Sequence, residues 1–350
     1  MVVAGCVLLA TKVRIIDFSA VKELLTMSDT LEIVEKAFRE KALNRVQMPV
    51  KPYLFLEKHG GDLRVMPSYL ERLDECGVKI VNVHPDNPEK YNLPSVMATI
   101  LLYQAETGAL LAIMDGTWIT AMRTGAAAGI ATKYLARKNA RRVGIVGLGY
   151  QSLFQLDALH NVVNIEYVKA YDIRKGRVEE FARATGRCLG IRVETADSIE
   201  NAVRNVDILV TLTPVRAPII RSEWIAEGTH INAIGADAPG KEELEPNILL
   251  RSKIVVDDWE QASHSGEINV PYSKGIIGKN DIYGEMGEIV AGLKLGRVTN
   301  DETTIFDSTG LSIHDVATGW HVYVLAKKKG IGYDIHSFFL PNDLKSSSNT

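Results

Sequence analysis

The sequence predicts an α/β protein in which a Rossmann-type, doubly wound parallel sheet follows a β-rich first third. Three observations predict this fold class. Short strand patterns and turns fill residues 47–114, strand and helix patterns alternate over residues 142–256, and a Gly-x-Gly pattern stands in the first turn of that alternation. Strands that alternate with helices usually form a parallel sheet with helices on both faces.

Composition limits the classes of function. The 350 residues are 46% hydrophobic, which is enough for one large domain or two ordinary ones, and the formal net charge is only −3. Clustered positive charge, as a nucleic-acid partner requires, is absent from the sequence, and no run reaches the roughly 18 apolar residues of a membrane span. The three cysteines lie far apart, which favours a reducing, cytoplasmic compartment.

The first third is expected to be mostly β-structure. The apolar residues 1–10 suggest a first strand that continues through Val13–Ile16. A helix is expected to start at Asp29, because an acid stands three residues after this capping side chain. Alternating polarity and turn residues then predict strands at residues 53–56, 63–66, 78–83, 96–104 and 110–114.

From residue 121 the pattern changes to alternating helices and strands. The small-residue segment 121–136 predicts a helix, as do residues 152–160, 175–185, 198–203 and 316–328. Strands are predicted at residues 142–146, 167–171, 191–193, 208–212, 230–234 and 254–256.

A dinucleotide site is predicted where the first of these strands ends. Gly147 and Gly149 would allow a tight turn and a close approach of the backbone to a pyrophosphate, and the following helix would offer its N-terminus to the anion. At the third position of the pattern Ser152 replaces the usual glycine or alanine, and serine is small enough for the helix to approach the strand. Asp172 ends the next strand, where an acid binds a ribose 2′-hydroxyl and repels a 2′-phosphate, so NAD is favoured over NADP, although Arg174 weakens that preference.

Five charged residues are candidates for the chemistry. Lys51, Arg64 and Arg123 would suit an anionic substrate, Lys79 interrupts an apolar strand, and Asp237 follows a strand of the predicted parallel sheet. Each also fits an ordinary surface charge, and Asp237 an ordinary turn acid, so the residues alone leave both interpretations open. His264 and Glu267 have no partners at metal-ligand spacing, so no metal site is predicted.

Seven motifs stand in order over roughly residues 15–328. They are Gln47-Met48-Pro49, Gly61 to Pro67, Gly77-Val78-Lys79, Met122 to Ala127, Gly147-x-Gly149-x-Gln151, Ile234 to Lys241 and Phe306 to Gly310. Together these motifs resemble the ornithine cyclodeaminase/mu-crystallin family. Lysine at position 51 makes the chain similar to the archaeal-type alanine dehydrogenases of this family, since the cyclodeaminase branch commonly has arginine there.

The resemblance implies a division of the chain and a role for each candidate residue. Residues 1–125 and 316–350 would form a substrate-binding and dimerisation domain of a homodimer, and residues 126–315 an inserted Rossmann domain. Lys51, Arg64 and Arg123 would bind the substrate carboxylate, with Lys79 and Asp237 as acid/base pair. The cofactor would contact Thr124, Gly147, Gly149, Tyr150, Gln151, Ser152, Asp172, Arg174, Thr213, Gly235 and Ser308.

The implied reaction is the reversible, NAD-dependent deamination of L-alanine to pyruvate and ammonia. Two alternatives share its first hydride transfer: cyclisation of ornithine to proline with recycling of NAD, and reduction of cyclic imino acids. A third alternative is a mu-crystallin-like protein that binds a nucleotide and a small ligand. The sequence does not separate these possibilities, because side chains that are distant in the chain set the length of the pocket.

Overall fold

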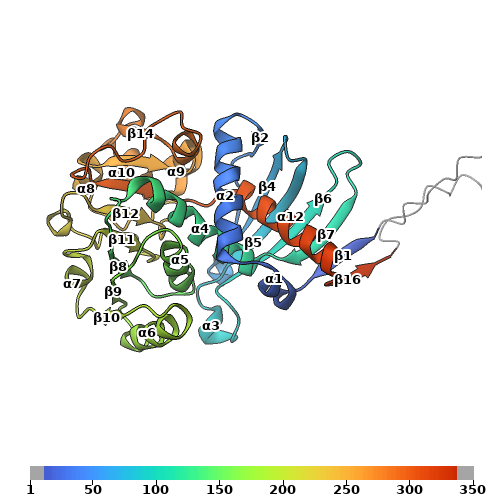
Figure 1. Ribbon diagram of the computed structural model, residues 1–350, viewed down its shortest axis with the longest axis horizontal. Coiled ribbons are helices and arrows are strands. Elements are labelled where there is room, and N and C mark those ends of the chain that lie inside the picture. Colours follow the sequence, from blue (N-terminus) through green and yellow to red (C-terminus); the bar gives the residue numbers. More distant parts are fainter. Residues whose placement is uncertain (1–11, 337–350) are drawn as a thin grey trace, which may run out of the picture.

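The structure, a computed structural model, describes residues 12–336 and contains two eight-stranded sheets. Figure 1 shows the sheets in two lobes, with helix α2 (Met27–Ala42) between them. The strand expected within residues 1–10 lies outside the described residues.

One lobe contains a mixed sheet, in the order β16-β1-β7-β6-β5-β4-β2, with β3 paired to β4. Its neighbours run antiparallel except for β1 and β7, which run parallel. Helix α12 (Ser312–Lys329) packs against β4, β5 and β6 (Figure 1). The strands are β1 (Val13–Ile16), β2 (Val46–Gln47), β3 (Tyr53–Leu56), β4 (Gly61–Leu70), β5 (Glu75–Val83), β6 (Val96–Tyr103), β7 (Leu110–Asp115) and β16 (Tyr333–Ile335).

The other lobe contains an all-parallel sheet, in the order β10-β9-β8-β11-β12-β15-β13-β14. The chain winds outward in both directions from β8, as in a Rossmann fold, so the predicted fold class is confirmed. The strands are β8 (Arg142–Val146), β9 (Tyr167–Tyr171), β10 (Val193–Thr195), β11 (Ile208–Thr211), β12 (His230–Ala233), β13 (Lys253–Val256), β14 (Ile282–Glu285) and β15 (Thr304–Asp307).

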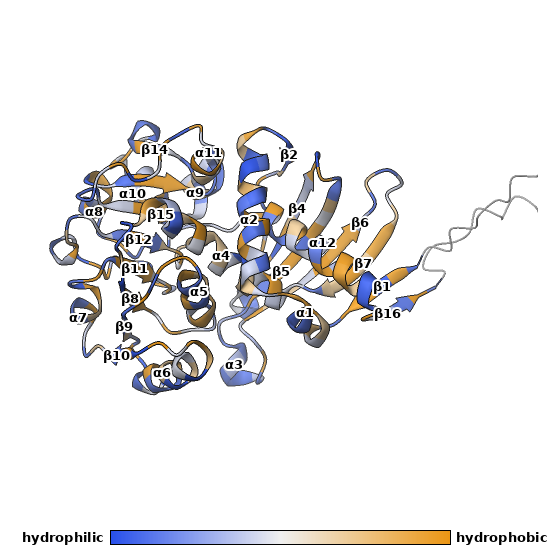
Figure 2. Cartoon of the chain, viewed as in Figure 1, coloured by the Kyte–Doolittle hydropathy of each residue, from blue (hydrophilic) through white to orange (hydrophobic). Residues whose placement is uncertain are grey.

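The remaining helices cover the sheets or lie at their ends. In Figure 2 the hydrophobic residues concentrate on the strands, whereas helix α6 shows many hydrophilic residues. The helices are α1 (Phe18–Leu24), α3 (Asn87–Lys90), α4 (Thr117–Leu135), α5 (Gln151–His160), α6 (Lys175–Leu189), α7 (Ile199–Val203), α8 (Pro246–Leu250), α9 (Trp259–Ser265), α10 (Asn269–Ser273) and α11 (Met286–Val290), with 3₁₀ turns at Glu57–His59, Ser222–Trp224 and Lys279–Asp281.

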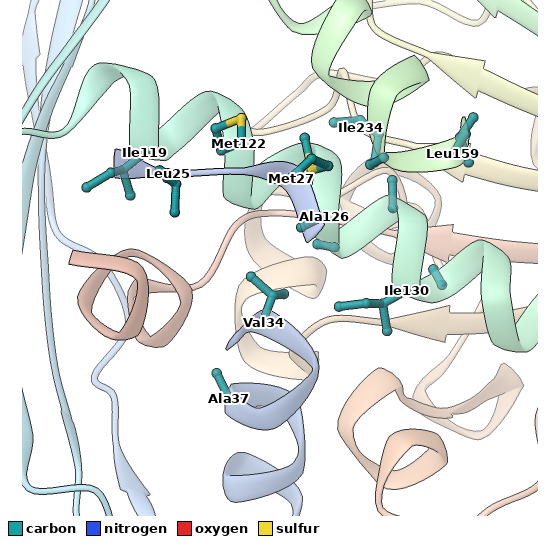
Figure 3. Packing of buried hydrophobic residues seen from close by; sticks show 14 of the residues in the cluster. Leu25, Met27, Val34, Ala37, Ile119, Met122, Ala126, Ile130, Leu159 and Ile234 are labelled. Carbon is teal, nitrogen blue, oxygen red and sulfur yellow. The ribbon is translucent and has the colours of Figure 1, made fainter. Parts of the chain in front are cut away.

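The helix predicted to start at Asp29 starts earlier. Its N-cap is Thr26, whose hydroxyl accepts a hydrogen bond from the Asp29 backbone N–H. The capping pattern of a hydroxyl followed three residues later by an acid is therefore present, one turn before the predicted position. Helix α2 then packs against α4 in a hydrophobic core that contains Val34 and Ala37 of α2 and Ala126 and Ile130 of α4 (Figure 3).

Helix α4 joins the two lobes and is buried over most of its length. Small side chains allow this burial, because neighbouring backbones can approach closely: a Cβ at Gly125 would collide with the backbone of Phe154 in α5. The domain boundary expected after residue 125 falls inside α4, and the one expected at residue 316 falls inside α12. A continuous helix therefore spans each boundary.

Two strands of the parallel sheet escaped the sequence analysis. β14 lies at the sheet edge, and β15, fully buried between β12 and β13, has no alternating pattern because both of its faces are covered. Among residues 12–336, no group of three or more His, Cys, Asp or Glu side chains could hold a metal ion. No helix within the same residues is long and apolar enough to span a bilayer.

Candidate active site

A cavity of about 140 Å³ lies where β4 and β5 of the mixed sheet face α4 and the carboxyl ends of β12 and β15. Ligands of doubly wound sheets bind at such carboxyl ends. The volume is below the roughly 300–1,000 Å³ of sites for drug-sized ligands, which favours a small molecule. The wall is formed by Lys51, Arg64, Met66, Lys79, Val81, Val83, Val96, Thr120, Arg123, Thr124, Gln151, Ile234, Asp237, Ser308, Thr309 and Gly310.

Lys79 is a buried cation in this wall. Its side chain is only 1% exposed, and Nζ lies 2.7 Å from Oδ2 of Asp315 on α12. Burial and the nearby guanidinium of Arg123 lower the pKa of Lys79 to about 7, although Asp315 acts in the opposite direction. At neutral pH this amine is therefore present in both protonation states, as acid/base chemistry requires.

Lys51 and Arg123 meet at the turn that follows β15. Lys51 donates a hydrogen bond of 2.7 Å to the carbonyl oxygen of Thr309, and burial followed by repulsion from Arg64 lowers its pKa to about 8. Arg123 lies against Gly310, the residue after Thr309, because a Cβ built on Gly310 would lie 2.5 Å from Nη1 of Arg123. Both cations are buried beside the cavity, where a substrate carboxylate would neutralise them.

The buried carboxyl group of Asp257 shapes this turn. It accepts hydrogen bonds from the backbone N–H groups of Thr309 (2.7 Å) and Gly310 (2.8 Å) and from the Thr309 hydroxyl. Burial raises the pKa of Asp257 to about 6, while the positive charge of Lys51 opposes that rise. Sequence analysis missed Asp257, because an acid at the end of a strand has no local feature that reveals its distant partners.

Arg64 and Asp237 form a separate ion-pair network in the cavity wall. Arg64 binds Asp62 through Nε (2.7 Å) and Nη2 (3.0 Å), and its Nη1 lies 2.9 Å from Oδ2 of Asp237. Asp237 also contacts Lys241 at 2.5 Å. Burial alone would raise the pKa of Asp237, but Arg64 and Lys241 outweigh it and hold that pKa below its ordinary value.

The structure therefore gives Lys79 and Asp237 different ion-pair partners. Both line the cavity, but Lys79 pairs with Asp315 and Asp237 pairs with Arg64 and Lys241. The acid/base role that the resemblance implies for the two residues stays a prediction. So do the carboxylate-binding roles of Lys51, Arg64 and Arg123, although all three lie in one wall.

The glycine-rich turn has the features of a nucleotide loop. Gly147 has a φ of 95°, which favours glycine, and a Cβ built there would lie 3.0 Å from the backbone of Leu212. The space beside the Cα of Gly149 is empty, since a Cβ built there would meet no atom within 4 Å. Helix α5 begins directly afterwards, and Ser152 closes its first turn by donating to the Gly149 carbonyl oxygen (2.8 Å).

Asp172 stands beside this turn and orders it. Its Oδ2 accepts the N–H of Leu148 (2.8 Å), and its Oδ1 accepts the N–H of Arg174 (2.8 Å). The carboxylate thus already supports the loop, and each oxygen keeps a further lone pair for a ribose hydroxyl. The side chain of Arg174 points to Glu89 of α3 (3.2 Å), while Tyr150 is half exposed beside the same loop.

Three further buried acids hold the loops at the carboxyl edge of the parallel sheet. Glu243 accepts the N–H groups of Thr213 (2.7 Å) and Gly235 (3.0 Å), which fixes two of the predicted cofactor residues. Glu267 accepts the N–H groups of Glu243 and Leu244. Asp307 accepts those of Glu267 and Ile268, and burial raises its pKa to about 8. None of these roles was visible in the sequence.

Two buried side-chain oxygens in the cavity wall, Thr120 Oγ1 and Gln151 Oε1, have no hydrogen-bond partner among residues 12–336. An unsatisfied buried polar atom is costly, so these atoms are suited to a polar ligand. Thr120 was not a sequence candidate, because a helical threonine commonly bonds its own backbone, as Thr124 does here to the Thr120 carbonyl oxygen (2.6 Å). With the glycine turn, this wall fits a dinucleotide whose reactive ring enters the cavity.

Comparison with known proteins identifies the family. A model of the ornithine cyclodeaminase/mu-crystallin family matches residues 12–330. The chain belongs to this family. The resemblance predicted from the seven motifs is therefore confirmed.

Several family members are similar over nearly their whole length. An alanine dehydrogenase from Archaeoglobus fulgidus is 51% identical over 319 residues, which are 91% of this chain and 96% of that protein. A solved archaeal alanine dehydrogenase dimer with bound NAD has a TM-score of 0.89 and 50% identity over 94% of this chain and all of that one. The Δ1-pyrroline-2-carboxylate reductase of Thermococcus litoralis, solved with NADH and L-proline, has a TM-score of 0.90 and 41% identity, covering 92% of this chain and all of that one.

Proposed function

We propose that the protein catalyses the NAD-dependent oxidative deamination of L-alanine to pyruvate and ammonia. The observation that carries this proposal is a small cavity whose wall holds three buried cations without a wall carboxylate as partner, Lys51, Lys79 and Arg123, together with an apolar patch of Met66, Val81, Val83 and Val96. The similarity to alanine dehydrogenases supports it.

The cations are suited to the carboxylate of an amino acid. Lys51 and Arg123 both line the cavity beside the turn at Thr309 and Gly310. A carboxylate between them would be held at two points, which would fix the orientation of Cα. Orientation of this kind can supply roughly 7–11 kcal/mol of a reaction barrier.

The apolar part of the wall favours alanine over ornithine. Met66, Val81, Val83 and Val96 line the cavity and suit a methyl group. The δ-ammonium group of ornithine would need an acid instead. The carboxylate among the described wall residues, that of Asp237, is already paired with Arg64 and Lys241. A second ammonium group would have to break that network or remain unpaired.

The near-neutral pKa of Lys79 suits the proton transfers of this reaction. Bound NAD would supply the hydride acceptor for Cα of alanine, and loss of that hydride would leave an iminium carbon on the substrate. Lys79 in its neutral form takes a proton from the water that attacks this carbon, and returns it as ammonia leaves. L-alanine, NAD⁺ and water thus give pyruvate, ammonium, NADH and one proton.

The glycine turn and Asp172 are the proposed NAD contacts. Gly147 and Gly149 allow the pyrophosphate to approach the N-terminus of α5, while Asp172 receives the adenosine ribose and disfavours a 2′-phosphate. Two similar structures, the archaeal alanine dehydrogenase and the T. litoralis reductase, contain NAD and NADH. Three further predicted contacts, Thr213, Gly235 and Ser308, follow the carboxyl ends of β11, β12 and β15.

One assay tests the proposed function. Purified protein is mixed with NAD and either L-alanine or L-ornithine, and both NADH absorbance and proline are measured. NADH with alanine, together with pyruvate in equal amount, is the expected result. Proline from ornithine without net NADH would replace the proposal with a cyclodeaminase. Tight NADH binding without either product would favour a ligand-binding protein.

A variant pair locates the chemistry. Lys79→Met is expected to abolish most turnover and to leave NADH affinity, measured by fluorescence, nearly unchanged, since Lys79 lies in the cavity wall and not in the glycine turn. Lys58→Met on the exposed 3₁₀ turn Glu57–His59 is the control and should keep full turnover. Equal activity in the two variants would remove Lys79 from the mechanism.

We also propose that the mixed sheet with α12 is the substrate and dimerisation domain and that the parallel sheet binds the cofactor. Helix α12 covers one face of the mixed sheet. The opposite face presents half-buried apolar side chains, among them Val65, Val78, Ile80, Leu101 and Ile113. Figure 2 shows β6 and β7 as largely hydrophobic. We propose that a second copy of the chain covers this face; the solved archaeal alanine dehydrogenase is a dimer.

Light scattering tests the homodimer. The mass in solution should be twice that of one chain, and Val78→Glu, which places a charge on the open face, should produce monomers. A wild-type monomer would refute the assignment of this face. A cytoplasmic setting is part of the same proposal, because Cys76 and Cys188 are free thiols.

A further inference from the structure

Asp315 lies behind the cavity wall, in the first turn of α12, and its side chain is completely buried. Its Oδ2 is 2.7 Å from Nζ of Lys79, and its Oδ1 accepts a hydrogen bond of 2.9 Å from Nε of Arg123. The carboxylate does not line the cavity itself. It therefore contacts two wall cations from the side that faces away from the substrate.

The other cations of the wall have different partners. Arg64 binds Asp62 and Asp237, and Lys51 binds the carbonyl oxygen of Thr309. Lys79 and Arg123 thus share one acid, Asp315. Removing this acid would leave a buried positive charge without a partner. Burial opposes the ionisation of Asp315, but Arg123 and Lys79 hold the pKa of its carboxyl below the ordinary value.

We infer that Asp315 is a positioning residue that fixes Lys79 and Arg123 relative to each other and decides how readily Lys79 gives up its proton. The inference rests on the proposed function only in assuming that Lys79 transfers this proton during alanine deamination. Asp315 on α12 binds the Lys79 amine and the Arg123 guanidinium through different oxygens, so it sets both the separation of the two cations and their charge balance.

The charges around Lys79 come from several elements. Asp315 is the acid in contact with it, and Arg123 of α4 and Lys51 before β3 repel its ammonium form. Arg64 of β4 lies in the same wall but is neutralised by Asp62 and Asp237. His314 is next to Asp315 on α12 and carries no charge at neutral pH, because burial lowers its pKa to about 3.

Removing the acid should therefore lower the pKa of Lys79. An opposite charge in contact typically shifts a pKa by about 1–3 units, so Asp315→Asn should move the Lys79 midpoint from near 7 to about 6 or below. The carboxamide has nearly the same shape, which keeps the packing of α12. Lys51 should be affected little, because Asp315 is not among the groups that shift its pKa most.

Cyanate measures this midpoint without any substrate. It carbamylates neutral amines and is small enough for the cavity, and peptide mass spectrometry quantifies the modification at Lys79 and at Lys51 in the same digest. We compare the carbamylation rate of Lys79, divided by that of Lys51, between Asp315→Asn and the wild type. If the Lys79 pKa falls by about one unit, this ratio at pH 6 should be about fivefold or more higher in the variant. A Lys79 midpoint within about 0.3 units of the wild-type value would overturn the inference.

A charge-balanced pair of variants covers the case in which Asp315→Asn does not fold. Arg123→Met is compared with Arg123→Met/Asp315→Asn, which removes one cation and one anion together. The Lys79 midpoint should be about one unit or more lower in the double variant, and equal midpoints would overturn the inference. In a variant that folds, the acid limb of the pH profile of alanine turnover should move with the carbamylation midpoint.

If Asp315 had only a structural role, its replacement would lower alanine turnover without moving the acid limb of the pH profile. That result would also overturn the inference. Failure of the wild type to oxidise alanine would refute the proposed function and leave the carbamylation result unaffected.

Discussion

Gly310 offers a sharp test of how the cavity is built, because replacing it with alanine acts on Arg123 in a calculable way. The backbone at Gly310 has a φ of 82°, and a Cβ added there would lie 2.5 Å from Nη1 of Arg123. Ordinary contacts between such atoms are about 3.5 Å, so the guanidinium must move by about 1 Å. Its Nε is held by Asp315 at 2.9 Å, so the group cannot simply retreat.

The two consequences have different sizes. A displacement of about 1 Å in a substrate-orienting group can cost roughly 100-fold in rate, so kcat/KM for alanine should fall by about that factor. The left-handed backbone costs about 1–2 kcal/mol for a residue with a Cβ, which should lower Tm by a few degrees. NADH affinity should change little, because the glycine turn at Gly147 is unaffected.

Gly108→Ala is the matched control. Gly108 also has a positive φ, of 72°, but a Cβ there would meet no atom within 4 Å. This variant should show a similar loss of Tm and full alanine turnover. The assay is NADH formation over a range of alanine concentrations, with thermal unfolding measured in parallel. An activity for Gly310→Ala within threefold of Gly108→Ala would refute the argument that Arg123 is held against this turn.

Three further predictions follow from other parts of the structure. The affinity of pyruvate for the NADH complex should fall as pH rises through about 7 and again through about 8, as Lys79 and Lys51 lose their protons, and Lys51→Arg should abolish the second step in a fluorescence titration. Asp172→Asn should raise the preference for NADPH relative to NADH by about tenfold or more, measured as the ratio of dissociation constants, whereas an unchanged ratio would contradict its role in excluding a 2′-phosphate. Asp207 accepts hydrogen bonds from Arg137, Arg141 and Arg142 far from the cavity. Burial raises the pKa of Asp207 less than these partners lower it, so Asp207 stabilises the fold above the unfolded-state pKa of about 3.9, and this stabilisation is lost as pH falls below that value. Asp207→Asn should therefore reduce Tm at pH 7 without a change in KM. A Tm equal to that of the wild type would exclude this contribution.

The Rossmann part of the fold was predictable because its signals are local. Alternating strand and helix patterns, the glycines at 147 and 149, and the acid at 172 each depend on a few neighbouring residues. The start of α2 shows the limit of such signals. Thr26 and Asp29 make the same capping pattern as the one expected at Asp29, and the local pattern does not distinguish the two positions. β15 was missed because burial on both faces removes the alternation that identifies a strand.

The sequence by itself determined the fold class, the family and a set of charged residues that lie along one cavity wall, because motifs and their order are carried by the chain. Only the tertiary structure decided which charges meet. Asp315 resembles an ordinary first-turn acid that favours a helix N-terminus, yet 192 residues separate it from Arg123, to which it is hydrogen-bonded. The pairing of a buried charge depends on which elements pack together, and packing brings together residues whose separation in the chain carries no pattern.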